Sequence, residues 1–377
     1  MIISSVRTTA FRNLADSVVF ANAKNVFLVG NNGQGKTNFL EAIYFCAYAS
    51  SFRGVHDKEI AQSGKNDFSA AINVGSEVLV KCERGKKSVF VDGKTMENRR
   101  ELLSVVPCIV FCHEDMEFVS GSPERQRWFF DQVLSLYDPA YLDDLHRYRR
   151  VVKSRNSVLR DHVLRKLDGD PQTLLDALDQ QCALYGVRLM EKRETAAKLF
   201  SDIFVSLYEA VSGISGVKVM YLPSWKGCTE EAAIELLWKQ RVRDLATGVS
   251  HSGPHRDRYI FAIDAESQAG ETTATVDFAA SASTGQRRLL ALLLRVAQAR
   301  RFSDMTGRNP ILLLDDVLLE MDGEKRRRFL SVLPGYDQAF FTFLPEEPFQ
   351  HYQEACVPGN ADTLVYNVKD GRIEAVP

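Results

Sequence analysis

The segment Gly30–Thr37 constrains this chain more than any other, because its sequence, GNNGQGKT, fits the pattern GxxxxGK[ST]. An apolar segment, Asn25–Val29, precedes it, and residues 38–49 have helical character. In a strand–loop–helix setting, backbone N–H groups curl around phosphates and the helix dipole favours their charge. Lys36 is predicted to reach the β and γ phosphates and Thr37 to bind magnesium. ATP and Mg²⁺ are therefore the expected cofactors.

A second apolar run, Ile311–Leu314, ends in two consecutive acids, Asp315 and Asp316. A P-loop needs a carboxylate at the end of a neighbouring strand to hold the metal, and Asp315 suits that role. Asp316 is then placed to orient or deprotonate the attacking water. The alternative, a buried strand ending in a turn, explains the apolar run but not two successive acids.

The segment STGQRR, residues 283–288, precedes the amphipathic run LLALLLRVAQAR and lies just before the acidic strand. It resembles the signature motif of ABC-type ATPases. In that class Ser283 and Gly285, at a helix N-terminus, would contact the γ-phosphate of ATP bound to the opposite subunit. A simple helix cap is the alternative role for Ser283 or Thr284. The segment Phe341–Phe343 has no histidine where many relatives place a histidine switch.

The chain carries 47 basic and 49 acidic residues, a formal net charge of -2, so any DNA binding must use a local patch. On a helix advancing about 100° per residue, residues 138–160 form a basic and an apolar face. The basic face carries Arg149, Arg150, Lys153 and Arg160, and the apolar face carries Leu145, Tyr148, Val152 and Leu159. The basic face is a candidate contact for DNA phosphates, with a merely solvated face as the alternative. Arg155 falls in the apolar sector and is expected to pair with a buried acid or to cross an interface.

Other polar and aromatic residues point to structure rather than chemistry. The seven cysteines, Cys356 among them, have no zinc spacing, and Cys108 and Cys112 lie in an apolar run typical of a buried strand. His255 and Asp257 are expected in a structural turn or beside DNA rather than in a metal site. The three tryptophans are expected in the core. No secretory signal or membrane-length apolar run is evident, which predicts a cytoplasmic protein without a membrane partner.

The spacing of apolar residues and the glycine content change along the chain. Short alternating runs between residues 68 and 91 predict antiparallel hairpins, whereas residues 123–212 have helical spacing and few glycines. The predicted fold is α/β: an ABC-type P-loop ATPase lobe with a mixed sheet, an antiparallel β subdomain and an inserted helical lobe, without a coiled-coil arm. The predicted division is 1–120 and 251–377 for the ATPase lobe and 121–250 for the helical insertion.

Several motifs outside the ATPase set occur in an order that resembles the RecF family over nearly the whole chain. They are Arg12-Asn13 after Phe11, SFRG at 51–54, HED at 113–115, GSPERQRWFFD at 121–131, the segment 138–160 and SGPHRD at 252–257. Thr284 departs from the family pattern, which usually has SQGQ or a near equivalent.

The resemblance implies a set of site residues. ATP would be bound by Arg12, Asn13, Gly30, Asn31, Asn32, Gly33, Gln34, Gly35, Lys36, Thr37, Asn38, Ser283 and Gly285, and Mg²⁺ by Thr37 and Asp315. Lys36, Asp316, Ser283 and Gln286 would act in hydrolysis. For Arg12 and Asn13 a capping or salt-bridge role remains an equal alternative.

The resemblance also implies partners. ATP would close two copies head to head, and slow hydrolysis would reopen the dimer. The family binds duplex DNA near single-strand gaps, works with RecO and RecR, and helps RecA load onto gapped DNA in recombinational repair, replication and the SOS response. Two other classes stay open: an ABC-type ATPase serving as a transport motor or structural SMC-like protein, and a P-loop kinase.

Overall fold

The computed structural model describes residues 1–96, 102, 105–164, 171–266, 272–318, 321–346 and 362–376, and Cys356 lies outside them. The chain packs into two compact units. The first comprises Met1–Asp115, Ala210–Ser212 and Ala291–Pro377, and the second comprises Met116–Glu209 and Gly213–Leu290. The domain limits predicted near residues 120 and 250 stay a prediction.

The first unit contains an antiparallel sheet with the strand order β2-β1-β4-β5-β6-β7. Its strands are β1 (Ser5–Thr9), β2 (Ser17–Phe20), β4 (Phe68–Asn73), β5 (Glu77–Glu83), β6 (Lys86–Val91) and β7 (Lys94–Thr95). Left-handed glycines make the tight turns between β4 and β5 at Gly75 and between β5 and β6 at Gly85. The predicted antiparallel subdomain is confirmed.

A second sheet in the same unit joins both ends of the chain, in the order β15-β14-β3-β13-β12-β8. Its strands are β3 (Asn25–Val29), β8 (Cys108–Phe111), β12 (Ile311–Leu314), β13 (Gln338–Phe343), β14 (Thr363–Lys369) and β15 (Arg372–Ala375). Only β15 runs antiparallel to its neighbour. Every residue of β3, β8, β12 and β13 is buried, as expected for parallel strands covered on both faces. The predicted mixed sheet is confirmed.

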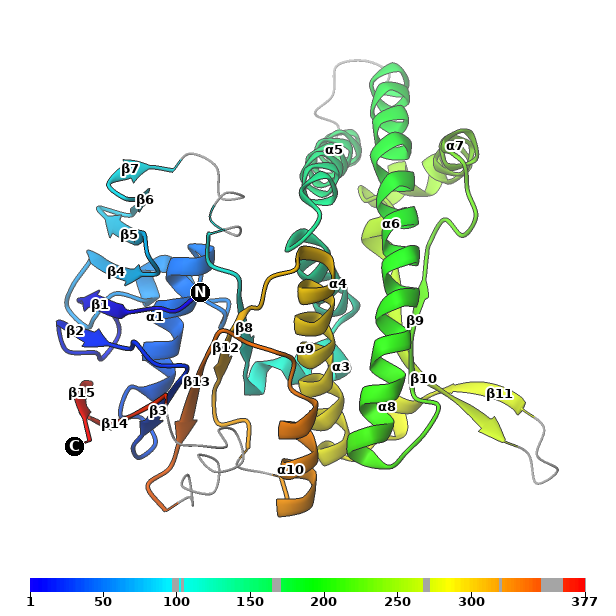
Figure 1. Ribbon diagram of the computed structural model, residues 1–377. Coiled ribbons are helices and arrows are strands. Elements are labelled where there is room, and N and C mark those ends of the chain that lie inside the picture. Colours follow the sequence, from blue (N-terminus) through cyan, green and yellow to red (C-terminus); the bar gives the residue numbers. More distant parts are fainter. Residues whose placement is uncertain are drawn as a thin grey trace. The chain divides into compact units, whose positions relative to one another are not determined.

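Helix α1 (Lys36–Tyr48) lies between these two sheets (Figure 1). It is apolar on most of its surface, and Phe39, Leu40 and Ile43 share one buried cluster with residues of both sheets. A helix covered on all sides is apolar all round rather than amphipathic. The P-loop that precedes α1 is therefore anchored to the core of this unit. Short helices η1 (Asp57–Glu59) and η2 (His113–Met116) and helix α10 (Gly323–Val332) complete the described elements here.

The second unit is mainly helical, with a small antiparallel sheet in the order β11-β10-β9. Its helices are α3 (Glu117–Ser120), α4 (Pro123–Ser135), α5 (Pro139–Val163), α6 (Gln172–Ser212), α7 (Glu230–Thr247), η3 (Pro254–Arg256) and α8 (Phe278–Ser281). Its strands are β9 (Lys218–Leu222), β10 (Arg258–Glu266) and β11 (Thr272–Asp277). Helix α9 (Thr284–Thr306) begins in this unit and continues in the first.

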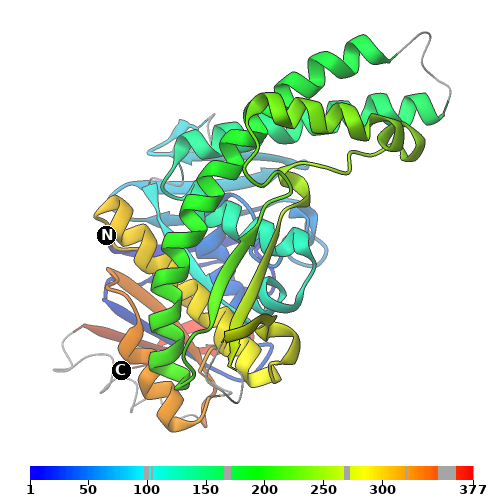
Figure 2. The ribbon, with the colours of Figure 1, turned by 90° about the vertical axis from the view of Figure 1, so that its right-hand side faces the viewer.

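Helices α5 and α7 run side by side (Figure 2), and α6 shares apolar clusters with both. Helix α6 has 41 residues but packs against its neighbours instead of forming a free arm. The predicted helical lobe without a coiled-coil arm is confirmed. Sequence-encoded caps begin its helices: Ser122 accepts from Arg125 N at 3.4 Å, and Asp138 accepts from Tyr141 N at 2.9 Å.

Several single-residue expectations are also tested by the fold. Cys108 is buried in β8 and Cys112 directly after it, as predicted. Trp225 is 1% exposed, but Trp238 is 64% exposed, so the core prediction is wrong for Trp238, which lies on the outward face of α7. Among the described helices, none combines the length and the apolar run that crossing a membrane requires.

Candidate functional site

The loop between β3 and α1 forms one side of a pocket in the first unit. The pocket is lined by Asn31, Asn32, Gly33, Gly35, Lys36, Thr37, Asn38, Arg53 and Asp316. The strand and helix expected on either side of the glycine-rich segment are both present. The motif therefore has the structural setting that phosphate binding requires.

Two glycines and Lys36 give the loop its shape. A Cβ atom at Gly30 would lie 2.3 Å from the carbonyl oxygen of Val368, and Gly35 has a φ of +118°. Lys36 Nζ donates to the carbonyl oxygens of Gly30 at 2.6 Å and Asn31 at 3.3 Å. Lys36 is only 4% exposed, and these two hydrogen bonds hold its charged end inside the curl of the loop. A phosphate in the curl would meet this charge.

Thr37 and Asp315 are brought together from positions far apart in the sequence. Thr37 Oγ1 donates to Asp315 Oδ1 at 2.8 Å. Burial first, and then the charge of Asp316, raise the pKa of Asp315 to about 6, against hydrogen bonds from Thr37 and Thr342. A hydroxyl and a buried carboxylate are hard oxygen ligands whose charge a divalent cation would balance. Their chemistry fits Mg²⁺.

Sequence reasoning missed Thr342 in β13. Its Oγ1 accepts from Asp316 N at 2.8 Å and lies 3.0 Å from Asp316 Oδ1 and 3.2 Å from Asp315 Oδ1. Parallel pairing of β12 with β13 brings the threonine to the acids. The sequence offered one signal, since Thr342 lies in the strand in which many relatives place a histidine switch.

Arg12 forms a buried ion pair beside the loop. Its Nε and Nη2 each donate to a carboxylate oxygen of Glu41 at 2.9 Å, and its Nη1 donates to the carbonyl oxygen of Glu59 at 2.7 Å. Ser51 also donates to Glu41. The Glu41 side chain is 0% exposed, so the pair is well shielded from water. The salt-bridge alternative for Arg12 is therefore the one present here.

Arg53, from the SFRG motif, is a second residue that sequence reasoning did not assign to the site. It lines the pocket, donates to Asn38 Oδ1 at 3.1 Å and lies 3.7 Å from Glu41. Its side chain is 28% exposed. A guanidinium there adds a second positive charge to a pocket that already holds Lys36.

Asn13 supports the loop through side-chain hydrogen bonds. Its Nδ2 donates to the carbonyl oxygen of Gly33 at 3.0 Å, and its Oδ1 accepts from Asn38 Nδ2 at 2.7 Å. The turn between β14 and β15 supports the other side, where Gly371 N donates to the carbonyl oxygen of Gln34 at 2.9 Å. Gly371 has a φ of +76°, and a Cβ atom there would lie 1.9 Å from the carbonyl oxygen of Asn13. Segments from both ends of the chain thus hold the loop in shape.

Ser283, Gly285 and Gln286 lie in the second unit, at the beginning of α9. Ser283 Oγ accepts from Gln286 N at 3.2 Å, and Ser283 N donates to Gln286 Oε1 at 2.7 Å. This reciprocal pair is a capping box, so the capping alternative is present. Ser283 and Gly285 are also exposed, and the N-terminus of a long helix favours anions.

The predicted basic face of α5 is exposed in the second unit. Arg149, Arg150, Lys153 and Arg160 are exposed, whereas Leu145, Tyr148 and Leu159 are buried and Val152 is partly buried. Arg149 pairs with Asp131 at 2.9 Å, but within the described ranges the other three cations make no ion pair. A pocket beside this face is lined by Tyr148, Arg149, Val152, Lys153, Asn156, Arg160 and His255.

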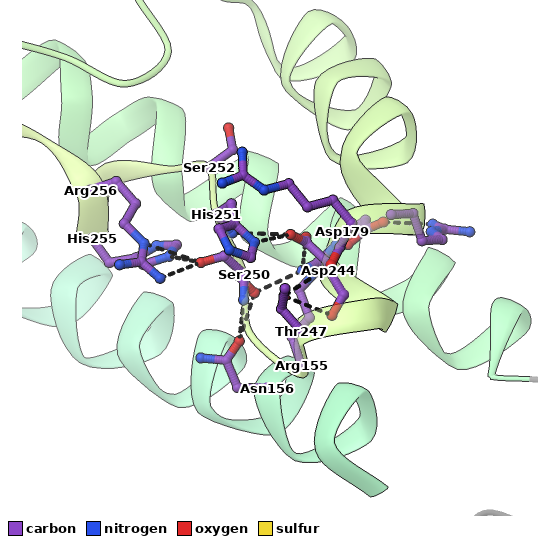
Figure 3. A network of polar contacts seen from close by, with 12 residues as sticks. Arg155, Asn156, Asp179, Asp244, Thr247, Ser250, His251, Ser252, His255 and Arg256 are labelled. Carbon is purple, nitrogen blue, oxygen red and sulfur yellow. Dashed lines mark hydrogen bonds and ion pairs between the residues drawn. The ribbon is translucent and has the colours of Figure 1, made fainter. Parts of the chain in front are cut away.

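Arg155 anchors the buried side of α5 (Figure 3). It donates to Asp179 at 2.6 Å, to Asp244 at 2.7 Å and to Ser250 Oγ at 2.7 Å, and its side chain is 0% exposed. The predicted pairing with a buried acid is confirmed. Ser250 also donates from N and Oγ to Asn156 Oδ1, which joins the stretch just before the SGPHRD segment to α5.

His255 and Asp257 serve the turn in which they lie. Asp257 accepts from Arg193 Nη1 at 2.8 Å and from Ser224 N at 2.8 Å. His255 is within hydrogen-bond distance of Tyr148 Oη at 2.8 Å, and burial lowers the pKa of His255 to about 4. The imidazole is therefore neutral near pH 7. Both residues lie in a hydrogen-bonded turn, as one of the two predicted alternatives had it, and the position beside DNA stays a prediction.

Comparisons with known proteins agree with this arrangement of motifs. A family model described as RecF/RecN/SMC N terminal domain matches residues 2–356. The DNA replication and repair protein RecF of Treponema pallidum (strain Nichols) is 40% identical over 367 residues, covering 96% of this chain and 97% of that protein. The protein of the same name from Lachnoclostridium phytofermentans is 32% identical over 346 residues, covering 89% and 91%.

Solved structures extend the likeness to three dimensions. The structure described as the recombination mediator protein RecF-ATP in the RecFOR pathway is 25% identical, covers 100% of this chain and 98% of its own, and has a TM-score of 0.86. A Pyrococcus furiosus Smc head domain, with an extended coiled coil and bound to the C-terminal domain of ScpA, is 15% identical, covers 100% and 96%, and has a TM-score of 0.52. The second likeness concerns the fold alone.

Proposed function

The chain belongs to the RecF family of RecF/RecN/SMC proteins, and from this we propose that it is an ATP-binding, ATP-hydrolysing protein of recombinational DNA repair. The observation that carries the proposal is the hydrogen bond of 2.8 Å between Thr37 of the P-loop and Asp315 of β12. It joins the two motifs that a P-loop ATPase uses together.

Each residue of the pocket has a proposed task in hydrolysis. The backbone of residues 30–38 and Lys36 hold the phosphates, and Thr37 and Asp315 hold Mg²⁺. The metal, when bound, neutralises charge on the phosphate oxygens. Asp316 orients the attacking water or accepts its proton. Arg12 and Asn13 support the nucleotide site through the ion pair and the loop contacts described above.

We further propose that ATP closes two copies of the chain head to head. Ser283, Gly285 and Gln286 of one copy then act on the nucleotide held by the P-loop of the other. The exposed N-terminus of α9 supports this role, because the dipole of a long helix favours a phosphate at that end. Slow hydrolysis would remove the bridging γ-phosphate and allow the dimer to open.

The proposed partners are duplex DNA at single-strand gaps and the proteins RecO and RecR, with which the chain would assist RecA loading in the cytoplasm. A solved relative is described as a recombination mediator in the RecFOR pathway. The exposed face of α5 supports DNA binding, since it presents Arg150, Lys153 and Arg160 without ion pairs among the described residues.

The test is the molar mass in solution, measured by light scattering for the wild type and for Asp316→Asn, with and without Mg-ATP and gapped duplex DNA. Blocked hydrolysis should preserve the ATP-bound state, so Asp316→Asn should double in mass with ATP and retain DNA in the heavier species. Lys36→Arg is the matched control: it should keep some ATP binding but lose most hydrolysis, by about 10²-fold. A monomer that binds ATP and ignores DNA would instead favour a kinase-like function.

A further inference from the structure

Among the described residues, the hydroxyl of Thr342 makes three polar contacts, all with the acidic pair at the end of β12. Its hydroxyl oxygen accepts the N–H of Asp316 at 2.8 Å and lies 3.0 Å from Asp316 Oδ1 and 3.2 Å from Asp315 Oδ1. The residue is 4% exposed, so water does not compete strongly for these contacts. Strand pairing, rather than a flexible loop, holds the hydroxyl there.

The contacts differ for the two acids. A threonine hydroxyl has one proton, so it donates to only one carboxylate at a time. Asp315 Oδ1 already accepts the proton of Thr37 at 2.8 Å, whereas Asp316 meets Thr342 through both its backbone N–H and its carboxylate. The hydroxyl is therefore tied more closely to Asp316.

Asp316 also needs such support because of its backbone. Its φ is +49°, in the left-handed region that residues with a side chain seldom adopt. Residues held in this region persist when surrounding contacts fix them, and they are frequent at active sites. The hydrogen bond from Asp316 N to Thr342 Oγ1 is one such contact, and it acts on the backbone that aims the carboxylate.

We propose that Thr342 is a positioning residue for ATP hydrolysis, which fixes the backbone and carboxylate of Asp316 so that the acid faces the pocket. The inference rests on the proposed ATPase function. It makes the orientation of the acid depend on β13. Asp316 lines the P-loop pocket, as this role requires.

The test compares Thr342→Val with Thr342→Ser. Valine keeps the shape of threonine but removes the hydroxyl, so it leaves Asp316 N–H without this acceptor. Steady-state hydrolysis should fall by about 10-fold or more in kcat, a modest share of what acid–base groups contribute. ATP affinity, measured with a fluorescent nucleotide, should change by less than about 3-fold. Serine should restore kcat to within about 3-fold of the wild type.

The matched control is Thr8→Val, which removes a hydroxyl from another buried threonine of the same unit, one that donates to Ala15 O at 3.3 Å. It should leave kcat unchanged. ATP-dependent mass doubling, measured for each variant, gives a readout besides turnover, and Thr342→Val should still double. Wild-type turnover by Thr342→Val, a Thr342→Ser variant as slow as the valine variant, or a parallel loss of ATP affinity would each overturn the proposal. Failure of the wild type to hydrolyse ATP would instead refute the proposed function.

Discussion

At the residue scale, two adjacent carboxylates of the first unit differ in burial, hydrogen bonding and backbone conformation. Asp315 is buried and hydrogen-bonded to Thr37, and its pKa is raised to about 6. Asp316 lines the pocket in a left-handed conformation. Their environments thus differ as the proposed roles require, one acid for a cation and the other for water, although they are neighbours in the chain.

The raised pKa of Asp315 predicts how stability depends on pH in the absence of nucleotide and metal. Because the folded-state pKa of about 6 lies above the unfolded value, the folded protein binds more protons between the two values. The free energy of unfolding should therefore fall as pH rises from about 4 to about 6, by at most about 3 kcal/mol.

Asp315→Asn removes this titration, so the difference in unfolding free energy between wild type and variant should change over the same pH window and be flat above pH 7. Urea unfolding followed by circular dichroism measures it. The same series with Glu83→Gln, an exposed acid of the same unit, is the control. A constant difference between wild type and Asp315→Asn across the window would contradict the assigned shift.

At the element scale, α5 is a helix with two different faces. Arg155 is buried among Asp179, Asp244 and Ser250, which ties the helix to its neighbours. The opposite side presents cations to solvent. Removing one partner of the buried set would leave an uncompensated charge, whereas neutralising the exposed cations should leave the fold intact.

Replacing Arg150, Lys153 and Arg160 together with alanine should weaken binding to a similar extent for every DNA sequence. If the three cations contact phosphates, the slope of log K against log salt should become shallower by about 3, since each contact releases counterions. Fluorescence anisotropy at several salt concentrations measures the slope. Lys65, Lys86 and Lys94, exposed lysines of the first unit, give a matched triple-alanine control. An unchanged slope in the α5 variant would show that this face contacts solvent and not DNA phosphates.

At the scale of the whole molecule, the proposed reaction requires two copies of the chain. The P-loop lies in one compact unit and the Ser283 segment in the other. The capping box explains why Ser283 and Gln286 begin α9, and the proposed dimer adds a role toward the partner's nucleotide. Substitution of Ser283 should therefore affect the free energy of unfolding and the ATP-dependent closure of the dimer differently.

Ser283→Asp separates the two roles. Aspartate caps a helix as well as serine does, so the free energy of unfolding should stay within about 0.5 kcal/mol of the wild type. Its negative charge would repel a γ-phosphate, and ATP-dependent mass doubling should be lost. Ser283→Arg should also block closure, by bulk. Ser281→Asp places the same charge at a nearby exposed serine and should close normally. Normal closure by Ser283→Asp would refute the signature role.

The sequence alone predicted most of the first unit's architecture. The glycine-rich motif, the apolar strands before it and before Asp315, and the turn glycines are local signals, and each forms the element it predicted. The helical lobe followed in the same way from apolar spacing and sparse glycine. Periodicity works here because burial on one face, or on all faces, dictates which residue types occur.

Contacts across the sheet and between distant segments were decided by tertiary structure. Thr342 was overlooked because its meaning depends on the parallel pairing of β12 with β13. Arg12 pairs with Glu41 at 2.9 Å, a partner that no local pattern named, while its role beside the nucleotide stays a proposal. Trp238 was expected in the core, yet it lies on the outward face of α7.

The sequence by itself therefore determined the class of site and the elements that carry it, because phosphate loops, acidic strand ends and amphipathic helices are encoded by neighbouring residues. Only the tertiary structure decided which further side chains meet at the site: Thr342 with Asp316, and Arg53 with the pocket. These pairs join residues that are far apart in the chain, and their meeting follows from strand order and packing, which no local pattern encodes.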